Sequence, residues 1–118
     1  MGYMRHHAIV VTSWKPELLA EAHAKAREIA GALVSPIVEG VTNGYASFLI
    51  APDGSNEGWE DSDRGDAQRA AFLTWADAQR YSDVSTALDW VEVQFGDGER
   101  ETRIVNDSDA ARRAQEKP

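Results

Sequence analysis

The spacing of hydrophobic and polar positions along the chain predicts alternating strands and helices. Residues 8–12 form a β-branched run that is apolar at consecutive positions, which is typical of a strand covered on both faces. Residues 16–30 begin with a proline and carry apolar side chains every three or four positions, so they are expected to form an amphipathic helix. Helical spacing returns over residues 66–80, where Phe72 and Trp75 share one stripe. These segments are the first strand and the two main helices of the expected fold.

An Asn-Gly pair at residues 43–44 separates two further apolar runs, residues 37–41 and 46–50. Both central residues of a type I′ turn have positive φ, so this pair predicts a tight hairpin in which Thr42 lies opposite Tyr45. With that register, one face carries most of the larger apolar side chains and is expected to face the core. The side chains on this face are those of Ile37, Val41, Ala46, Phe48 and Ile50.

Apolar residues occupy every second position of residues 90–95, alternating with Trp90, Glu92 and Gln94, which predicts a strand. It is the last strand that the sequence predicts clearly. We expect Val91, Val93 and Phe95 to face the core, because they are the apolar half of the alternation. Trp90 is then expected on the opposite face of the strand.

The C-terminal part of the chain carries weaker signals. Residues 102–105 are a candidate edge strand, and residues 106–118 have no apolar stripe, so we expect a flexible polar tail there. Residues 1–105 are then a single α+β domain. The order β-α-β-β-α-β of the certain elements predicts a ferredoxin-like sandwich, with a four-stranded antiparallel sheet and both helices on one face.

Composition narrows the classes of partner. The 118 residues include 20 Asp and Glu against 12 Lys and Arg, which gives a formal net charge of −8. A surface of this charge repels nucleic acid and anionic membranes, so neither is an expected partner. The chain has no cysteine, which excludes a disulfide scaffold and thiolate chemistry and suits the cytoplasm. No apolar run approaches the roughly 20 residues that span a bilayer.

Residues 51–65 are too long and too acidic for an ordinary connection in a small domain. Counted as a calcium loop from Asp53, they place Arg64 where a bidentate Glu is required, so we expect neither a metal nor a cofactor. Long loops often carry function, and tryptophan is enriched at binding hot spots. The expected binding residues are Asp53, Ser55, Glu57, Trp59, Glu60, Asp61, Asp63, Asp66 and Arg69.

No complete set of catalytic residues is present in the sequence. There is no Gly-x-Ser-x-Gly elbow and no phosphate-binding glycine motif. His23 borders the apolar stripe of the first helix, where histidines are mostly packed helix residues. The main alternative is a small metal- or histidine-dependent hydrolase. Its candidate residues are His23 or His7 together with Asp53, Asp61 or Asp63. An acidic mimic of nucleic acid is a further alternative, which is weaker because the acids are interleaved with Lys and Arg.

A sheet with helices on one side leaves its other face wet or covered by a partner. Tyr45, Leu49 and Trp90 are the large side chains expected on that face. A small domain gains stability from covering such a patch, so we expect a homodimer that forms through this face.

Six short phrases of the sequence, in the same order, resemble a group of short, mostly uncharacterised proteins encoded by tailed bacteriophages and prophages. The phrases are Ala8-Ile-Val-Val-Thr-Ser-Trp14, Glu21-Ala-His-Ala-Lys25, Asn43-Gly-Tyr45, Ile50-Ala-Pro-Asp-Gly-Ser55, Glu57-Gly-Trp59 and Asp89-Trp-Val-Glu-Val-Gln94. The resemblance implies a phage accessory protein that acts in the host cytoplasm, and it supplies no catalytic residues. We therefore expect a non-catalytic binding protein whose partner is a host or defence protein, or a small signalling ligand.

Overall fold

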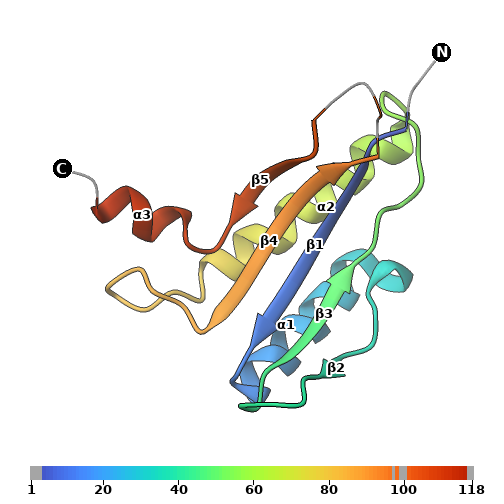
Figure 1. Cartoon of the computed structure of the whole chain (residues 1–118). Helices are drawn as coiled ribbons and strands as arrows, with labels where there is room; N and C mark the ends of the chain where they lie inside the picture. Colours follow the sequence, from blue (N-terminus) through green and yellow to red (C-terminus); the bar gives the residue numbers. More distant parts are fainter. Residues whose placement is uncertain (1–3, 97, 99–100, 117–118) are drawn as a thin grey trace.

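The computed structural model describes residues 4–96, 98 and 101–116 (Figure 1). The strands are β1 (His6–Ser13), β2 (Val38–Glu39), β3 (Ala46–Ile50), β4 (Leu88–Phe95) and β5 (Arg103–Asp107). The helices are α1 (Pro16–Ala30), α2 (Glu60–Asp77) and α3 (Ala110–Glu116), with a short 3-10 turn, η1 (Gly31–Leu33), after α1. The fold class is therefore α+β, as predicted. None of the helices in this part of the chain is long and apolar enough to cross a membrane.

The strands form one antiparallel sheet in the order β2-β3-β1-β4-β5. β1 lies at the centre of the sheet and pairs with β3 on one side and β4 on the other. The predicted count of four strands is wrong, because β5 pairs with β4 and extends the sheet to five strands. The register of that pair shifts between Glu92 and Val93, and β5 is mostly exposed. An exposed edge strand needs no apolar alternation, which is why its sequence signal is weak.

The hairpin between β2 and β3 contains the predicted Asn-Gly turn in a longer loop. Asn43 and Gly44 both have positive φ, as a turn of this kind requires. However, Ala46 pairs with Glu39 instead of with Val41, and the Gly40 N–H donates to the Tyr45 carbonyl at 2.7 Å, so β2 is shifted by two residues from the predicted register. Val41 consequently lies in solvent instead of on the core face. Ile37 is also exposed, so both of these predicted core positions are wrong.

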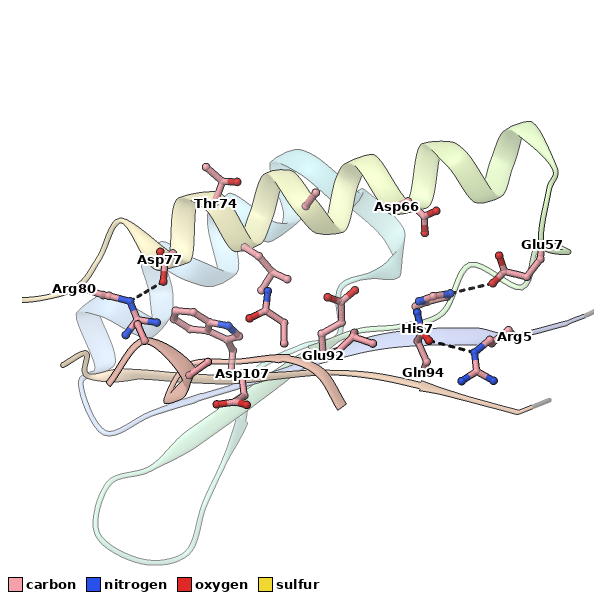
Figure 2. Close-up of a pocket in the computed structure, with 17 residues that line it drawn as sticks. Arg5, His7, Glu57, Asp66, Thr74, Asp77, Arg80, Glu92, Gln94 and Asp107 are labelled. Atoms are coloured by element: carbon pink, nitrogen blue, oxygen red, sulfur yellow. Dashed lines mark hydrogen bonds and ion pairs between the residues drawn. The ribbon is translucent and has the colours of Figure 1, made fainter. Parts of the chain in front are cut away.

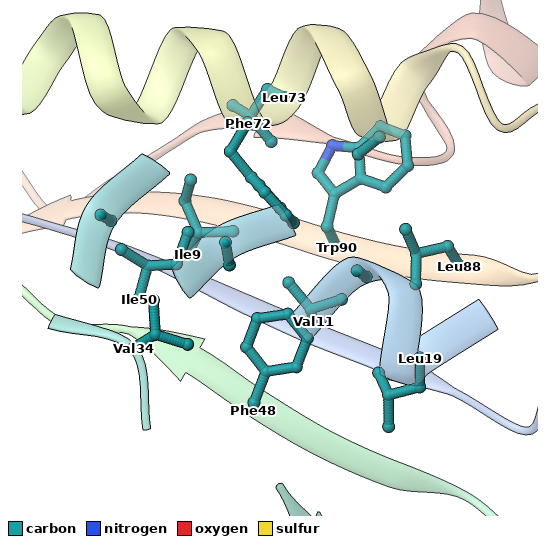
Figure 3. Packing of buried hydrophobic residues seen from close by; sticks show 14 residues of the cluster. Ile9, Val11, Leu19, Val34, Phe48, Ile50, Phe72, Leu73, Leu88 and Trp90 are labelled. Atoms are coloured by element: carbon teal, nitrogen blue, oxygen red, sulfur yellow. The ribbon is translucent and has the colours of Figure 1, made fainter. Parts of the chain in front are cut away.

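Helices α1 and α2 cover the same face of the sheet, and the core lies between the two layers (Figures 1 and 3). Phe48 and Ile50 of β3 face this core, as predicted. The helices contribute alanines together with larger side chains such as those of Leu19 and Phe72. The buried cluster contains Ile9, Val11, Leu19, Ala22, Ala26, Ala30, Val34, Phe48, Ile50, Phe72, Leu73, Ala76, Leu88 and Trp90.

The orientation of β4 is the reverse of the predicted one. Leu88 and Trp90 point into the core, and Trp90 is only 5% exposed. Val91, Val93 and Phe95 are half-buried on the opposite side of the strand. The prediction assigned the uniformly apolar half of the alternation to the core. Glu92 and Gln94 follow Trp90 on the inner face. Each lies near an arginine, as described below, and this reduces the cost of burying them.

The chain beyond residue 105 carries regular structure where the composition predicts a polar tail. β5 continues to Asp107, and α3 follows. Ser108 between them is buried, and its hydroxyl accepts a hydrogen bond from the Trp90 backbone N–H at 3.1 Å. The Ser108 N–H in turn donates to the Trp90 carbonyl at 3.0 Å. This pair of bonds anchors the start of the last helix to β4.

Candidate functional site

The space between α2 and the sheet changes from apolar to polar along β1 and β4. Alternate residues of a strand share one face, so the face that carries Ile9 also carries His7 and Arg5. On β4, the face that carries Trp90 continues with Glu92 and then with Gln94. Figure 2 shows these polar side chains beneath the N-terminal half of α2.

A pocket of about 830 Å³ lies along this boundary (Figure 2). On the helix side it runs from Asp66 to Asp77 of α2, a distance of about 16 Å at 1.5 Å per residue. Its floor is formed by β4 and β5, and two alanines of α3, Ala110 and Ala111, also line it. The pocket therefore depends on β5 and α3, the two elements for which the sequence signal is weakest.

Ion pairs hold the polar end of the pocket together. The His7 Nε2 atom lies 3.0 Å from the Glu57 carboxylate, which ties β1 to the loop before α2. Arg69 of α2 donates to Asp66 one turn earlier on the same helix. The Nε atom of Arg69 also lies 3.7 Å from the Glu92 carboxylate, which is longer than a hydrogen bond. Glu92 is thus the least well paired acid in this network.

The Glu92 carboxyl group also has a shifted pKa. Burial raises its pKa, and the positive charges of Arg69 and His7 only partly oppose this effect. Asp66, a nearby negative charge, adds to the rise. The net pKa of Glu92 therefore lies above its ordinary value of 4.5. A carboxyl group in this setting gains from a nearby cation when it is ionised.

Two buried donors that line the pocket have no hydrogen-bond partner among the described residues. They are the Nη1 atom of Arg5 and the Nε1 atom of Trp90, and both side chains are more than nine-tenths buried. Arg5 uses its other nitrogens to donate to Gln94 and to the Glu101 carbonyl. Figure 3 shows the indole nitrogen of Trp90 on the side of the ring that faces Leu73 of α2. Such unpaired buried donors cost about 1–3 kcal/mol each, which an acceptor brought by a ligand would recover.

Arg80 closes the end of the pocket next to the indole of Trp90. Its guanidinium carbon lies 5.2 Å from the centroid of that ring, and its Nε donates to Asp77 at 2.6 Å. A second guanidinium nitrogen donates to the Val84 carbonyl at 2.8 Å. The Trp90 ring is therefore held between the core and a fixed cation.

The predicted binding residues are divided between this pocket and a second hollow. Glu57 and Asp66 line the large pocket, and Arg69 contacts Asp66 and Glu92 at its edge. The second hollow, of about 400 Å³, lies on the other side of the loop against the end of α1. The predicted residues that line it are Asp53, Ser55, Trp59 and Asp61. Glu60 and Asp63 lie exposed in the first turn of α2.

The loop that carries these residues has its own internal bonds. The Asp53 carboxylate accepts hydrogen bonds from the Ser55 backbone N–H at 2.9 Å and from its hydroxyl at 2.7 Å. Burial raises the pKa of Asp53, but these bonds and the charges of Arg69 and His7 outweigh it, so the net pKa is lowered. In the first turn of α2, the Asp61 carboxylate accepts a hydrogen bond from Arg64 Nη1 at 2.8 Å. Trp59 at the start of α2 is 53% exposed. The loop is an ordered turn with an exposed aromatic side chain.

The three residues predicted on the outer face of the sheet do not all lie there. Leu49 of β3 is exposed, and so is Tyr45 just before that strand. Trp90 is not on that face, because it belongs to the core and to the pocket. The outer face instead includes Val10, which pairs directly with Leu49 in the sheet register and is exposed.

The histidines do not join the aspartates that the hydrolase alternative requires. The Nε2 atom of His23 lies 2.8 Å from the Ser35 carbonyl, and its ring packs edge-on against Phe48. His7 pairs with Glu57 instead of with Asp53. In the described part of the chain, no three side chains of His, Cys, Asp or Glu form a group suited to a metal ion.

Sequence reasoning missed Arg5, Arg80, Glu92 and Gln94 as residues of a site. Arg5 could have been found from the sequence. Alternate residues of a strand share one face, so extending the strand from the buried Ile9 toward the N-terminus places His7 and Arg5 on the buried face. Polar residues at positions expected to be buried are more informative than exposed ones. Comparison of the chain with protein-family models, with curated proteins and with solved structures finds no match in any of the three.

Proposed function

We propose that the chain is a non-catalytic binding protein that encloses a small polar molecule between α2 and β4. One observation carries the proposal: Trp90 and Arg5, each of which has a buried donor without a partner among the described residues, line the same pocket. Concave sites with a few convergent polar groups are typical of small-ligand binding, and a flat protein interface has no need of buried donors of this kind. The lining therefore favours the small ligand over a host protein as the main partner.

The biological part of the proposal rests on the resemblance to short phage-encoded proteins. A phage accessory protein of this kind would act in the host cytoplasm by sequestering a small signalling ligand. The hydrolase alternative has weaker support, because His23 is engaged by the Ser35 carbonyl and His7 by Glu57.

We further propose that β1 to β4 with α1 and α2 form a ferredoxin-like unit to which β5 and α3 are added. Two such chains would pair through the outer face of the sheet.

The test is to purify the chain from bacterial cells under native conditions and weigh the intact protein by native mass spectrometry. We expect a bound small molecule that is released on denaturation. Ala70 lines the pocket and Ala71 does not, although both are exposed on α2. We therefore expect Ala70→Phe to lose the bound mass and the matched control Ala71→Phe to keep it. An equal loss in both variants, or a chain without bound mass that instead captures a host protein, would contradict the proposal.

A further inference from the structure

The acids that line the pocket differ in how well they are paired. Four of them have a close basic partner: Glu57 pairs with His7, Asp66 with Arg69, Asp77 with Arg80, and Asp107 with Arg113. For Glu92, the ion pair found in the described part of the chain is the 3.7 Å contact to Arg69, whose guanidinium is already engaged by Asp66. A half-buried carboxylate without a hydrogen-bonded cation is an attractive site for a positively charged group.

Glu92 stands next to the unpartnered indole donor. Trp90 and Glu92 are two residues apart on one face of β4, so their Cα atoms are about 7 Å apart along the strand. This spacing places a carboxylate acceptor beside a buried N–H donor. A ligand that satisfies both needs a cationic nitrogen and, close to it, a hydrogen-bond acceptor.

The remaining lining supports a cation over an anion. Five carboxylates line the pocket, against the guanidinium groups of Arg5 and Arg80 in the lining and those of Arg69 and Arg113 that pair with it. The small local excess of negative charge and the net charge of −8 on the whole chain oppose the entry of a phosphate or carboxylate. Leu73, Ala70 and Val105 add apolar surface near these polar groups, which suits a short aliphatic segment.

We infer that the pocket binds a small organic cation in which an ammonium group contacts Glu92 and a neighbouring carbonyl oxygen accepts from Trp90 Nε1. This inference rests on the proposed function and names the chemical class of its ligand. An α-amino amide with an aliphatic side chain is the simplest molecule that carries all three features. Arg5, at the far end of the pocket, then contacts a neutral acceptor or water.

The test uses L-leucinamide as the probe, two matched molecules that each lack one feature, and one anion of similar shape. 4-Methylpentanamide lacks the amine, 3-methylbutylamine lacks the carboxamide, and 4-methylpentanoate is an anion of similar shape. Binding is followed by the indole N–H signal of Trp90 in ¹H–¹⁵N spectra, which is assigned by its loss in Trp90→Phe. We expect L-leucinamide to shift this signal and to bind at least about tenfold more tightly than any of the other three molecules.

Variants of two acids separate a specific contact from a general effect of charge. Glu92→Gln is expected to weaken L-leucinamide binding about tenfold or more and to leave 4-methylpentanamide unaffected. Asp63→Asn removes an exposed charge from α2 outside the pocket and is expected to change neither. The inference is overturned if any of the other three molecules binds as tightly as L-leucinamide, although a binding pocket would still be shown. It is also overturned if L-leucinamide leaves the Trp90 signal unshifted, while the bound mass in native spectra tests the proposed function separately.

Discussion

Arg69 of α2 and Glu92 of β4 face each other across the interior of the sandwich, with Nε and the carboxylate oxygen 3.7 Å apart. Arg69 is buried and also binds Asp66, so one guanidinium joins the helix to the sheet and to its own preceding turn. The pair marks the point where the apolar core ends and the pocket begins. It also explains how β4 can bury a glutamate two residues beyond a core tryptophan.

Loss of Arg69 is expected to be far more costly than loss of Glu92. Arg69→Met leaves the half-buried Glu92 without its nearest cation, and breaking a buried pair in this way costs about 3 kcal/mol or more. Glu92→Gln leaves Arg69 paired with Asp66, so its free energy of unfolding should stay within about 1 kcal/mol of the wild type. Urea denaturation of the two variants measures the difference. Equal destabilisation by both changes would show that the contact to Glu92 has no special role.

The raised pKa of Glu92 predicts how stability depends on pH. The native state holds this proton more tightly than the unfolded state does, so ionisation of Glu92 costs stability as pH rises from about 4.5 through its native pKa. Glu92→Gln has no such cost. The stability of Glu92→Gln relative to wild type should therefore increase over this pH range and be constant above it. Thermal unfolding of both proteins from pH 4 to pH 8 provides the comparison, and a relative decrease would mean that the native pKa is lowered.

Gly65 in α2 is required by a close approach of the preceding loop. A methyl group at this position would overlap the Asp53 carboxylate and lie 3.2 Å from Arg69 Nη1. Gly→Ala in an exposed helix normally stabilises by about 1 kcal/mol. Here we expect Gly65→Ala to lower the free energy of unfolding instead, and we expect Asp53→Ala to relieve that loss in the double variant. A double-mutant cycle measured by urea denaturation tests this coupling, which would be absent if the variants were additive.

The sequence predicts this fold best where one local rule acts alone. The positive φ of Asn43 and the burial of Phe48 both follow from the turn and from alternation. Alternation alone could not orient β4, because each of its faces carries large side chains. The observed orientation buries Trp90 and places Glu92 beside Arg69, a residue of another element. The pocket could not be predicted for the same reason. It forms only when β5 packs beside β4. Neither the register shift between Glu92 and Val93 nor the hydrogen bond from the Trp90 backbone N–H to Ser108 can be predicted from the residues next to them in the sequence.

The outer face of the sheet predicts the oligomeric state. Val10 and Leu49 are direct neighbours across β1 and β3, and both are exposed. We expect a dimer at micromolar concentration, because this arrangement leaves apolar area in water. Leu49→Lys should shift the dimer to monomer with little loss of thermal stability, whereas Trp90→Phe should leave the oligomeric state unchanged. Light scattering of the three proteins decides the matter, and a monomeric wild type would rule the dimer out.

Binding at the exposed loop and binding in the pocket are two alternatives, and they predict opposite effects of the same variants. The residues Trp59, Glu60 and Asp61 point outward at the start of α2, whereas Glu92 and Trp90 lie beneath the helix. Because the loop's internal bonds come mainly from Asp53 and Ser55, replacing those three outward residues by alanine should leave the fold intact. We expect this triple variant to keep its bound small molecule in native mass spectra and Trp90→Phe to lose most of it. The reverse result would place binding at the exposed start of α2, where Trp59 is 53% exposed and of a residue type enriched at binding hot spots.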